Sequence, residues 1–195
     1  MLRRFDRGNT DKFAAASERE SIVFGAARPG YGDERVGQWI ERMKQHNIQR
    51  VCCLLTSAQL DRYLDLLGAY RRSFGTDRVC WAPIQDFQWV ERESLTHCIL
   101  PFLTSAARLQ EKVVVHCSGG VGRTGQVLTA WLVYGRGFSN QTAIAAVKRS
   151  GRNPYEAAIA AALKGQNPWK SIAKFNALLE DARQAGESCQ TQSSI

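Results

Sequence analysis

Residues 113–125 read VVVHCSGGVGRTG, a run in which a buried strand leads into a glycine-rich loop and then into a helix. A cysteine, Cys117, stands at the start of this loop, and an arginine, Arg123, stands at its end. The small loop residues let successive backbone N–H groups point to one centre, and the N-terminus of the following helix adds partial positive charge. The loop is therefore expected to bind a tetrahedral oxyanion, with the forked guanidinium of Arg123 on two of its oxygens. The expected anion-binding residues are Ser118, Gly119, Gly120, Val121, Gly122 and Arg123.

The same environment favours the thiolate form of Cys117, because the amide dipoles, the helix terminus and Arg123 all stabilise a negative charge. A thiolate beside a bound phosphate is a nucleophile, and its attack on phosphorus gives a covalent phosphocysteine. The hydroxyl of Thr124 is expected to donate to the sulfur when it leaves in a second step. His116 is expected to brace the loop by hydrogen bonds rather than to move protons.

Two nucleotide-binding loops do not fit these residues. A P-loop has glycine five residues before its final Gly-Lys pair, where this chain has Cys117, and Arg123 replaces the lysine. The glycine spacing of a dinucleotide-binding turn is also absent.

The run from His116 to Thr124 resembles the His-Cys-x-x-Gly-x-x-Arg-Ser/Thr signature of the cysteine-dependent protein tyrosine phosphatase superfamily. The chain looks like its small dual-specificity phosphatases, particularly compact microbial ones, over about residues 21–180. The resemblance implies an α/β fold with a central, mostly parallel sheet flanked by helices, and a reaction that needs no metal or other cofactor. It also implies that the substrates are phosphotyrosine and phosphoserine or phosphothreonine monoesters in proteins.

Enzymes of this superfamily protonate the leaving oxygen with an aspartate on a loop after the preceding strand. Asp86 fits that place, since it follows an expected strand and stands 31 residues before Cys117. Glu91 and Glu93 lie on the same loop, but nearer to the next helix. Asn153 is a possible auxiliary residue for the hydrolytic water, with a helix-punctuating turn as the alternative.

Strands and helices alternate along most of the chain, which favours an α/β domain with a mostly parallel sheet. Strands are expected at about 21–28, 50–55, 78–84 and 112–116, and helices at 58–74, 94–110, 125–134, 139–149, 155–163 and 169–184, with another beginning at residue 33 or 34. Residues 1–20 are expected to be a flexible arm, 21–185 the catalytic domain and 186–195 a disordered tail.

The composition agrees with one soluble globular domain, with 195 residues, 44% hydrophobic and 23% charged. The 26 basic residues outnumber the 18 acidic ones, which gives a net charge of +8 and predicts anionic partners. No signal sequence or membrane span is recognisable, so a cytoplasmic protein with reduced cysteines is expected. Of these cysteines, Cys52 and Cys53 are expected on opposite faces of a strand, where one is a candidate for redox protection of Cys117. A monomer is also expected.

Three other functions use the same features. A phosphoinositide phosphatase is disfavoured because the loop between Cys117 and Arg123 has no lysine for further phosphates. An RNA 5′-phosphatase is disfavoured because the basic residues are spread along the chain without an RNA-binding motif. Arg28 and Arg152 are candidates to line the mouth of the site, with plain surface charges as the favoured alternative. A catalytically silent phosphoprotein-binding module is disfavoured because Cys117, Arg123 and Asp86 are all present. The expected partners are therefore phosphorylated proteins, and neither a membrane nor nucleic acid.

Overall fold

The computed structural model describes residues 11–192, and side chains as far as Gly186. Its centre is a five-stranded sheet with the order β1-β2-β5-β3-β4. The four strands from β2 to β4 in that order are parallel, and the short edge strand β1 runs antiparallel to β2. The strands are β1 (Ala14–Ala15), β2 (Val23–Ala27), β3 (Ile48–Cys53), β4 (Val79–Trp81) and β5 (Lys112–Cys117).

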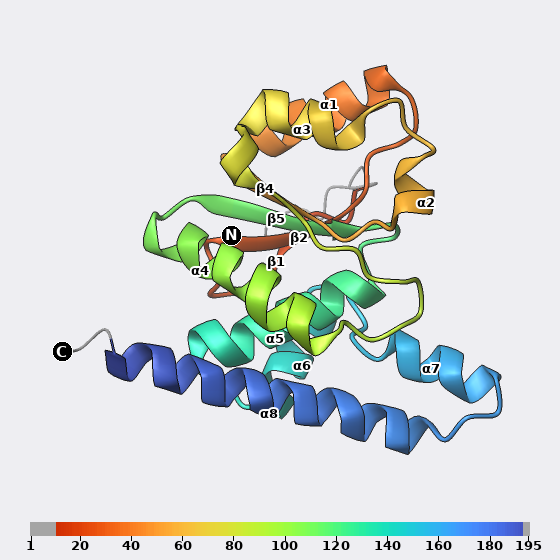
Figure 1. The fold of residues 1–195 in the computed structure, drawn as a ribbon, viewed down its shortest axis with the longest axis vertical. Coiled ribbons are helices and arrows are strands. Elements are labelled where there is room, and N and C mark those ends of the chain that lie inside the picture. The colour runs from red at the N-terminus through yellow and green to blue at the C-terminus, as the bar shows by residue number, and fades with distance from the viewer. Residues whose placement is uncertain (1–10, 193–195) are drawn as a thin grey trace, which may run out of the picture.

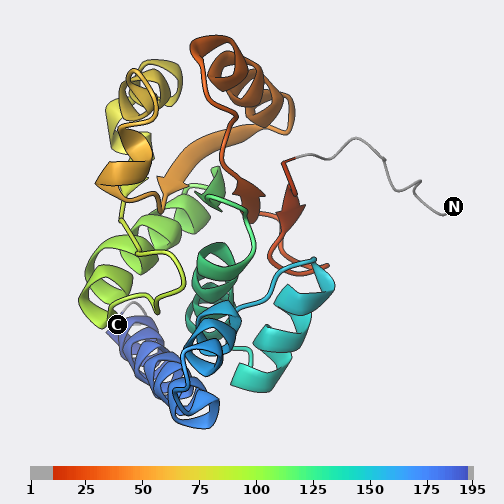
Figure 2. The ribbon, with the colours of Figure 1, turned by 90° about the vertical axis from the view of Figure 1, so that its right-hand side faces the viewer.

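Helices cover both faces of this sheet (Figure 1). On one side lie α1 (Asp33–Gln45) and α3 (Leu66–Phe74), with the short α2 (Ser57–Leu60) beyond the end of β3. On the other side lie α4 (Leu100–Arg108), α5 (Gly122–Arg136), α6 (Asn140–Arg149), α7 (Glu156–Leu163) and α8 (Pro168–Gln192). The view in Figure 2 shows the same separation, with α1 and α3 apart from the α4–α8 group. The expected α/β architecture with a mostly parallel sheet is confirmed.

The sheet separates two apolar clusters, because its central strands are buried on both faces. Successive residues of a strand point to opposite faces. Accordingly, Cys52 packs in the cluster under α4, α5, α6 and α8, whereas Cys53 packs in the cluster under α1 and α3. The prediction that these two thiols face opposite sides of the sheet is confirmed.

The single helix expected at 58–74 is wrong, because the chain turns between α2 and α3. Asp65 ends the turn and caps α3, accepting a hydrogen bond from the backbone N–H of Gly68 at 2.9 Å. Tyr63, within the turn, donates its hydroxyl to the carbonyl of Pro29 at 2.8 Å. The helix expected at 94–110 begins instead as a π-helical turn, η2 (Ser94–Ile99), and continues as α4. The strand expected at 78–84 is only the three-residue β4, although the N–H groups of Ala82 and Ile84 still donate to the carbonyls of Cys53 and Leu54 at 3.0 and 3.2 Å.

The flexible arm expected at residues 1–20 is wrong for its described part, residues 11–20, which is attached to the domain. Here β1 pairs with β2, and the carboxylate of Glu20 is almost completely buried. That carboxylate accepts hydrogen bonds from Trp131 Nε1 at 2.9 Å, Arg136 Nε at 2.8 Å and the backbone N–H of Ile22 at 2.8 Å. Residues 1–10 of the expected arm lie outside the described residues.

The last helix also extends further than expected. α8 continues to Gln192, so the prediction of a disordered tail is wrong for residues 186–192, and residues 193–195 lie outside the described part. Phe175, Leu179 and Ala182 are buried against α5 and its neighbours. Gly186 lies inside α8 and does not end it. Glycine is needed there because α8 passes close to the Tyr134 carbonyl, and a Cβ would lie 2.8 Å from its oxygen. In the described residues, no helix has the length and apolar character needed to cross a membrane.

The buried carboxylate of Glu20 generates a stability prediction. Burial raises its pKa, but the hydrogen bonds from Arg136, Ile22 and Trp131 together lower it below the ordinary value of 4.5. Its contribution is therefore present above about pH 4.5 and is lost as the pH falls through the lowered pKa. We expect Glu20→Gln to reduce the free energy of unfolding at pH 7 by about 2 kcal/mol, because an uncharged amide cannot accept all these bonds.

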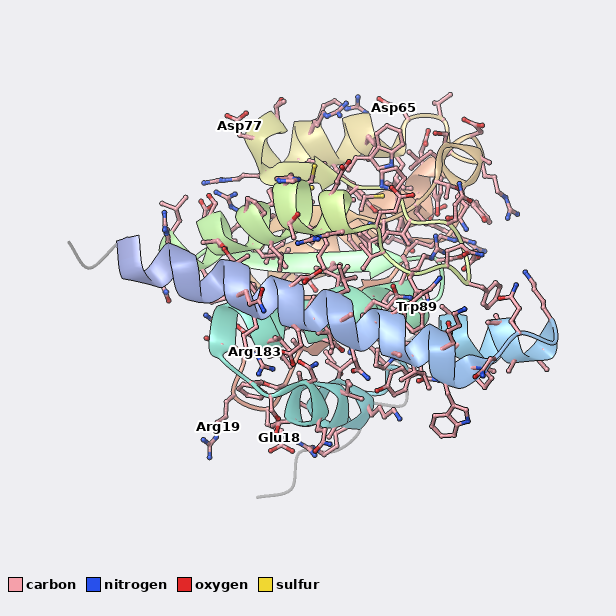
Figure 3. The ribbon with its side chains drawn as sticks, turned by 60° about the horizontal axis from the view of Figure 1, so that its bottom comes forward. Glu18, Arg19, Asp65, Asp77, Trp89 and Arg183 are labelled. Atoms are coloured by element: carbon pink, nitrogen blue, oxygen red, sulfur yellow. The ribbon has the colours of Figure 1, made fainter. Side chains whose placement is uncertain are left out.

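The measurement is urea denaturation of wild type and variant between pH 7 and pH 3. The difference in free energy of unfolding between wild type and Glu20→Gln should shrink as the pH falls. The control is Glu18→Gln, two residues away on the exposed surface (Figure 3), which should match wild type throughout. An equal loss of stability in both variants at pH 7 would contradict the assignment.

Candidate active site

The glycine-rich loop lies where β5 ends and α5 begins, at the carboxyl edge of the parallel sheet. Cys117 is the last residue of β5 and is only 3% exposed. The backbone N–H of Gly120 donates to its Sγ over 3.2 Å. One amide of the loop therefore donates to the sulfur.

The loop needs glycine at position 120 for two reasons. Gly120 has a φ of +68°, a conformation that other residues adopt only with strain. In addition, a Cβ there would lie 2.6 Å from the backbone of Ala26 and Ala27 at the end of β2. The neighbouring Arg28 N–H donates to the Cys117 carbonyl at 2.9 Å, so the end of β2 fixes the loop from one side.

Arg123 is almost completely buried, with its guanidinium held by neighbouring segments of the chain. Its Nη1 donates to the Ile84 carbonyl at 2.8 Å and to Gln59 Oε1 at 2.9 Å. Its Nη2 lies 3.2 Å from Asp86 Oδ1, but without hydrogen-bond geometry. Among the described residues, Nη2 is thus a buried donor without an acceptor, which leaves it available to the oxygen of a bound anion.

Asp86 lies on the loop after β4, beside Arg123, where the sequence predicts it. Besides the ion pair with Arg123, its Oδ2 accepts from Gln59 Nε2 at 3.4 Å. Its side chain is 47% exposed, so this carboxylate faces solvent while the guanidinium faces the interior. The competing Glu93 is instead the residue that precedes η2, and Glu91 accepts from the Leu95 N–H through its backbone carbonyl.

His116 precedes the cysteine and is completely buried. Its Nε2 lies 3.1 Å from the hydroxyl of Tyr70, on α3. Burial, together with the positive charges of Arg123 and Arg28, lowers the pKa of His116 to about 3. The ring is therefore neutral at physiological pH, in agreement with a bracing part rather than proton transfer.

Thr124 follows Arg123 in the first turn of α5 and is completely buried. Its Oγ1 has no hydrogen-bond partner among the described residues. A buried hydroxyl of this kind retains an unused donor within the loop that holds the sulfur.

Three further residues have clear positions. Arg28 lies near the loop, with its Nε 3.5 Å from Ser118 Oγ and its Nη1 donating to the hydroxyl of Tyr63 at 2.8 Å. Arg152 is buried, with its guanidinium donating to the backbone of residues 12 and 150, and burial lowers its pKa to about 10. The Asn153 side chain accepts from the Tyr155 N–H at 3.2 Å, which is the bond expected of a turn.

Sequence reasoning missed two residues at the site. Gln59 connects Arg123 with Asp86, and Glu156 on α7 packs so closely on Gly122 that any Cβ at Gly122 would collide with its carboxylate. For Gln59 a signal existed, because Thr56 and Gln59 have capping-box spacing just after a buried strand. The Thr56 N–H indeed donates to Gln59 Oε1 at 3.3 Å. For Glu156 the sequence holds no comparable signal.

Solved structures with similar folds define the class of protein. The chain is similar to kinase associated phosphatase (KAP), with 26% identity, a TM-score of 0.59 and coverage of 67% of this chain and 78% of that one. It is similar to Tk-PTP in its active form, with 23% identity, a TM-score of 0.60 and coverage of 80% and 92%. It is also similar to TpbA of P. aeruginosa, with 18% identity, a TM-score of 0.55 and coverage of 93% and 99%. The fold is that of the cysteine-dependent protein tyrosine phosphatases, in its small dual-specificity form.

A family model is more specific. Residues 25–137 match the family described as "Tc-R-P: Polymorphic toxin system, DSP-PTPase phosphatase". The match spans more than half of the chain, and the chain belongs to this family. It is thus a phosphatase of the cysteine-dependent superfamily. No curated protein sequence matches the chain.

The bridging position of Gln59 generates a prediction. We expect Gln59→Ala to lower kcat for p-nitrophenyl phosphate by about tenfold, the effect of one lost hydrogen bond to a charged group. Steady-state kinetics with a circular dichroism check of folding measure it. Gln38→Ala, on the exposed face of α1, is the control and should keep wild-type rates. Wild-type kinetics in Gln59→Ala would show that Arg123 and Asp86 need no such bridge.

Proposed function

We propose that this phosphatase hydrolyses phosphotyrosine, and also phosphoserine or phosphothreonine, in proteins through a phosphocysteine intermediate. The observation that supports it most is the buried, acceptor-free Nη2 of Arg123 in the loop that surrounds Cys117 Sγ, with Asp86 beside it. An anion-binding group (Arg123), a nucleophile (Cys117) and an acid (Asp86) then lie together in one site. The residues proposed to bind phosphate are 118–123, and those proposed to act in the chemistry are Cys117, Arg123, Asp86 and Thr124, with His116 as a brace.

In the proposed first step, the thiolate of Cys117 attacks phosphorus, and the bond between phosphorus and the leaving oxygen breaks. Protonated Asp86 gives its proton to that oxygen, which leaves as the alcohol or phenol. The loop amides and the guanidinium of Arg123 bind the three equatorial oxygens, where charge is spread in the transition state. The product of this step is phosphocysteine and an ionised Asp86.

In the second step, water attacks phosphorus and the sulfur–phosphorus bond breaks. Asp86 accepts the proton of the water, and the Thr124 hydroxyl donates a hydrogen bond to the departing sulfur. Inorganic phosphate leaves and the thiolate is restored. Asn153, whose side chain caps a turn in the segment packed on α5, remains a candidate for placing this water.

Support for a protein substrate comes from the loop. None of residues 118–122 is charged, so the loop offers no added cation for the further phosphates of an inositol ring. TpbA has been solved in complex with pTyr, and PTPMT1 in complex with PI(5)P. These likenesses, at 17% and 14% identity, concern the fold, so phosphoinositides and 5′-phosphorylated RNA stay as comparison substrates in the assay.

The central test is substitution of the nucleophile and of the anion-binding arginine. We expect Cys117→Ser and Arg123→Ala each to reduce hydrolysis of phosphotyrosine peptides by at least about a thousandfold, because each removes a group made for the transition state. Arg123→Lys should be nearly as impaired, since lysine keeps the charge and loses the fork. Metal chelators should have no effect.

The matched control is Cys98→Ser, which changes an exposed cysteine and should keep wild-type activity. Turnover by Cys117→Ser above one per cent of wild type, in protein that remains folded, would refute the mechanism. Faster hydrolysis of RNA 5′-phosphate or a phosphoinositide than of any phosphopeptide would refute the substrate class.

A separate test concerns the acid. We expect Asp86→Asn to slow phosphotyrosine and phosphoserine hydrolysis by about 10²–10⁴-fold, the usual contribution of a positioned proton donor. The effect should be smaller for aryl phosphates with acidic phenols, whose leaving oxygen needs less protonation. Rates for a series of aryl phosphates measure this, and an equal loss for every leaving group would contradict the assignment. Glu91→Gln is the control on the same loop.

A further inference from the structure

A cavity lies beside the loop that carries Asp86 and is lined by none of the residues of the phosphate-binding loop. It has a volume of about 420 Å³ and is bounded by α7, the first turns of α8 and residues 87–89 of the loop that carries Asp86. Small side chains on α7, such as Ala157 and Ala161, leave the space open. Nothing in the proposed chemistry uses this cavity.

Its charge is entirely of one sign. Lys164, Lys170 and Lys174 line it, and no lining residue is acidic. Within residues 11–186, none of these three ammonium groups makes an ion pair. The chain has only seven lysines, so three of them meet at this cavity. Three unpaired cations around one hollow favour an anionic occupant.

The walls of the cavity are fixed by specific contacts. Trp89 stacks on Phe175 of α8 with ring centroids 4.8 Å apart, and its Nε1 donates to Ser171 Oγ at 2.8 Å. Figure 3 shows Trp89 beside the first half of α8. Gln126 of α5 holds the loop from the other side, donating to the Gln88 carbonyl at 3.0 Å and accepting from the Val90 N–H at 2.8 Å. The cavity therefore exists before any ligand arrives, which lowers the entropic cost of binding.

The cavity is also next to the proposed site of chemistry. Phe87, which lines it, directly follows Asp86, and Asp86 lies 3.2 Å from Arg123 Nη2. Phe87 has a φ of +59° and is half-exposed, so the chain turns at the residue that joins Asp86 to the wall of the cavity. An extended peptide advances about 3.3 Å per residue. Because the loop that carries Asp86 also forms a wall of the cavity, we expect a side chain a few residues from the phosphorylated residue to reach the lysines.

We propose that this lysine-lined cavity binds a second anionic side chain of the phosphoprotein substrate, either a carboxylate or a second phosphate near the residue that is hydrolysed. The proposal rests on the proposed function, since it needs a peptide in the active site. It gives the enzyme a preference for phosphorylated residues in acidic or multiply phosphorylated segments.

The test compares two phosphotyrosine peptides that differ only in having glutamate or glutamine at the positions flanking the phosphotyrosine. We expect the wild-type kcat/KM to be about tenfold higher for the glutamate peptide, which is the sum of three weak, exposed ion pairs. The combined substitutions Lys164→Ala, Lys170→Ala and Lys174→Ala should reduce this ratio to near one. A bisphosphorylated peptide should show the same loss.

The charge-matched control removes three positive charges elsewhere, by Lys44→Ala, Arg71→Ala and Arg108→Ala on α1, α3 and α4. This variant should keep the tenfold preference. Equal loss of preference in both triple variants would overturn the proposal and assign the effect to overall charge.

p-Nitrophenyl phosphate separates failure of this proposal from failure of the proposed function, because it has no second anion. If the wild type hydrolyses p-nitrophenyl phosphate, and hydrolyses the glutamate and glutamine peptides with the same kcat/KM, the cavity proposal is overturned and the proposed function stands. A lysine dependence seen only with short-chain phosphoinositides, and with neither peptide, would likewise overturn a protein occupant.

Discussion

The site depends on one buried positive charge. Removing a guanidinium from water is costly unless its donors are satisfied. Arg123 meets this requirement only in part, because Ile84 and Gln59 hold Nη1 while Nη2 is left without an acceptor of its own. The unused donor indicates that a bound anion accepts the remaining hydrogen bond of the guanidinium. Because the chain belongs to a phosphatase family, we infer that this anion is a phosphoryl group.

Several elements near the site supply a hydrogen bond or an ion pair to the guanidinium of Arg123. The ends of β3 and β4 bring the Leu54 and Ile84 carbonyls to Nη1, at 3.4 Å and 2.8 Å. α2 adds Gln59, and the loop after β4 adds Asp86. Burial meanwhile keeps the neighbouring titratable groups neutral, since it lowers the pKa of His116 to about 3 and raises the pKa of Cys53 to about 12. Arg123 thus acts on the loop without a competing buried charge from either residue.

The sequence predicted the parts of the site that are local. Cys117, the loop glycines and Arg123 stand within seven residues. Asp86 lies 31 residues before Cys117 and was predicted only through the resemblance, which implies an aspartate on the loop after a strand. Gln59 could not be predicted as a bridge, because its contacts with Arg123 and Asp86 join segments 64 and 27 residues apart. Arg152, which the sequence offers as a candidate for the mouth of the site or as a surface charge, is instead buried under the N-terminal segment, because a charge pattern does not reveal which carbonyls will surround a guanidinium. The same limitation concealed Glu20, whose buried bonds with Trp131 and Arg136 attach residues that looked like a free arm.

The most direct measurement is mass spectrometry of the protein quenched with acid during turnover of a phosphotyrosine peptide. Covalent catalysis by Cys117 predicts one added phosphoryl group on the peptide fragment that contains this residue, which disappears when substrate is exhausted and never forms in Cys117→Ser. A phosphoryl group on any other residue, or rapid turnover with no phosphorylated enzyme under conditions where hydrolysis of the intermediate limits the rate, would contradict the account.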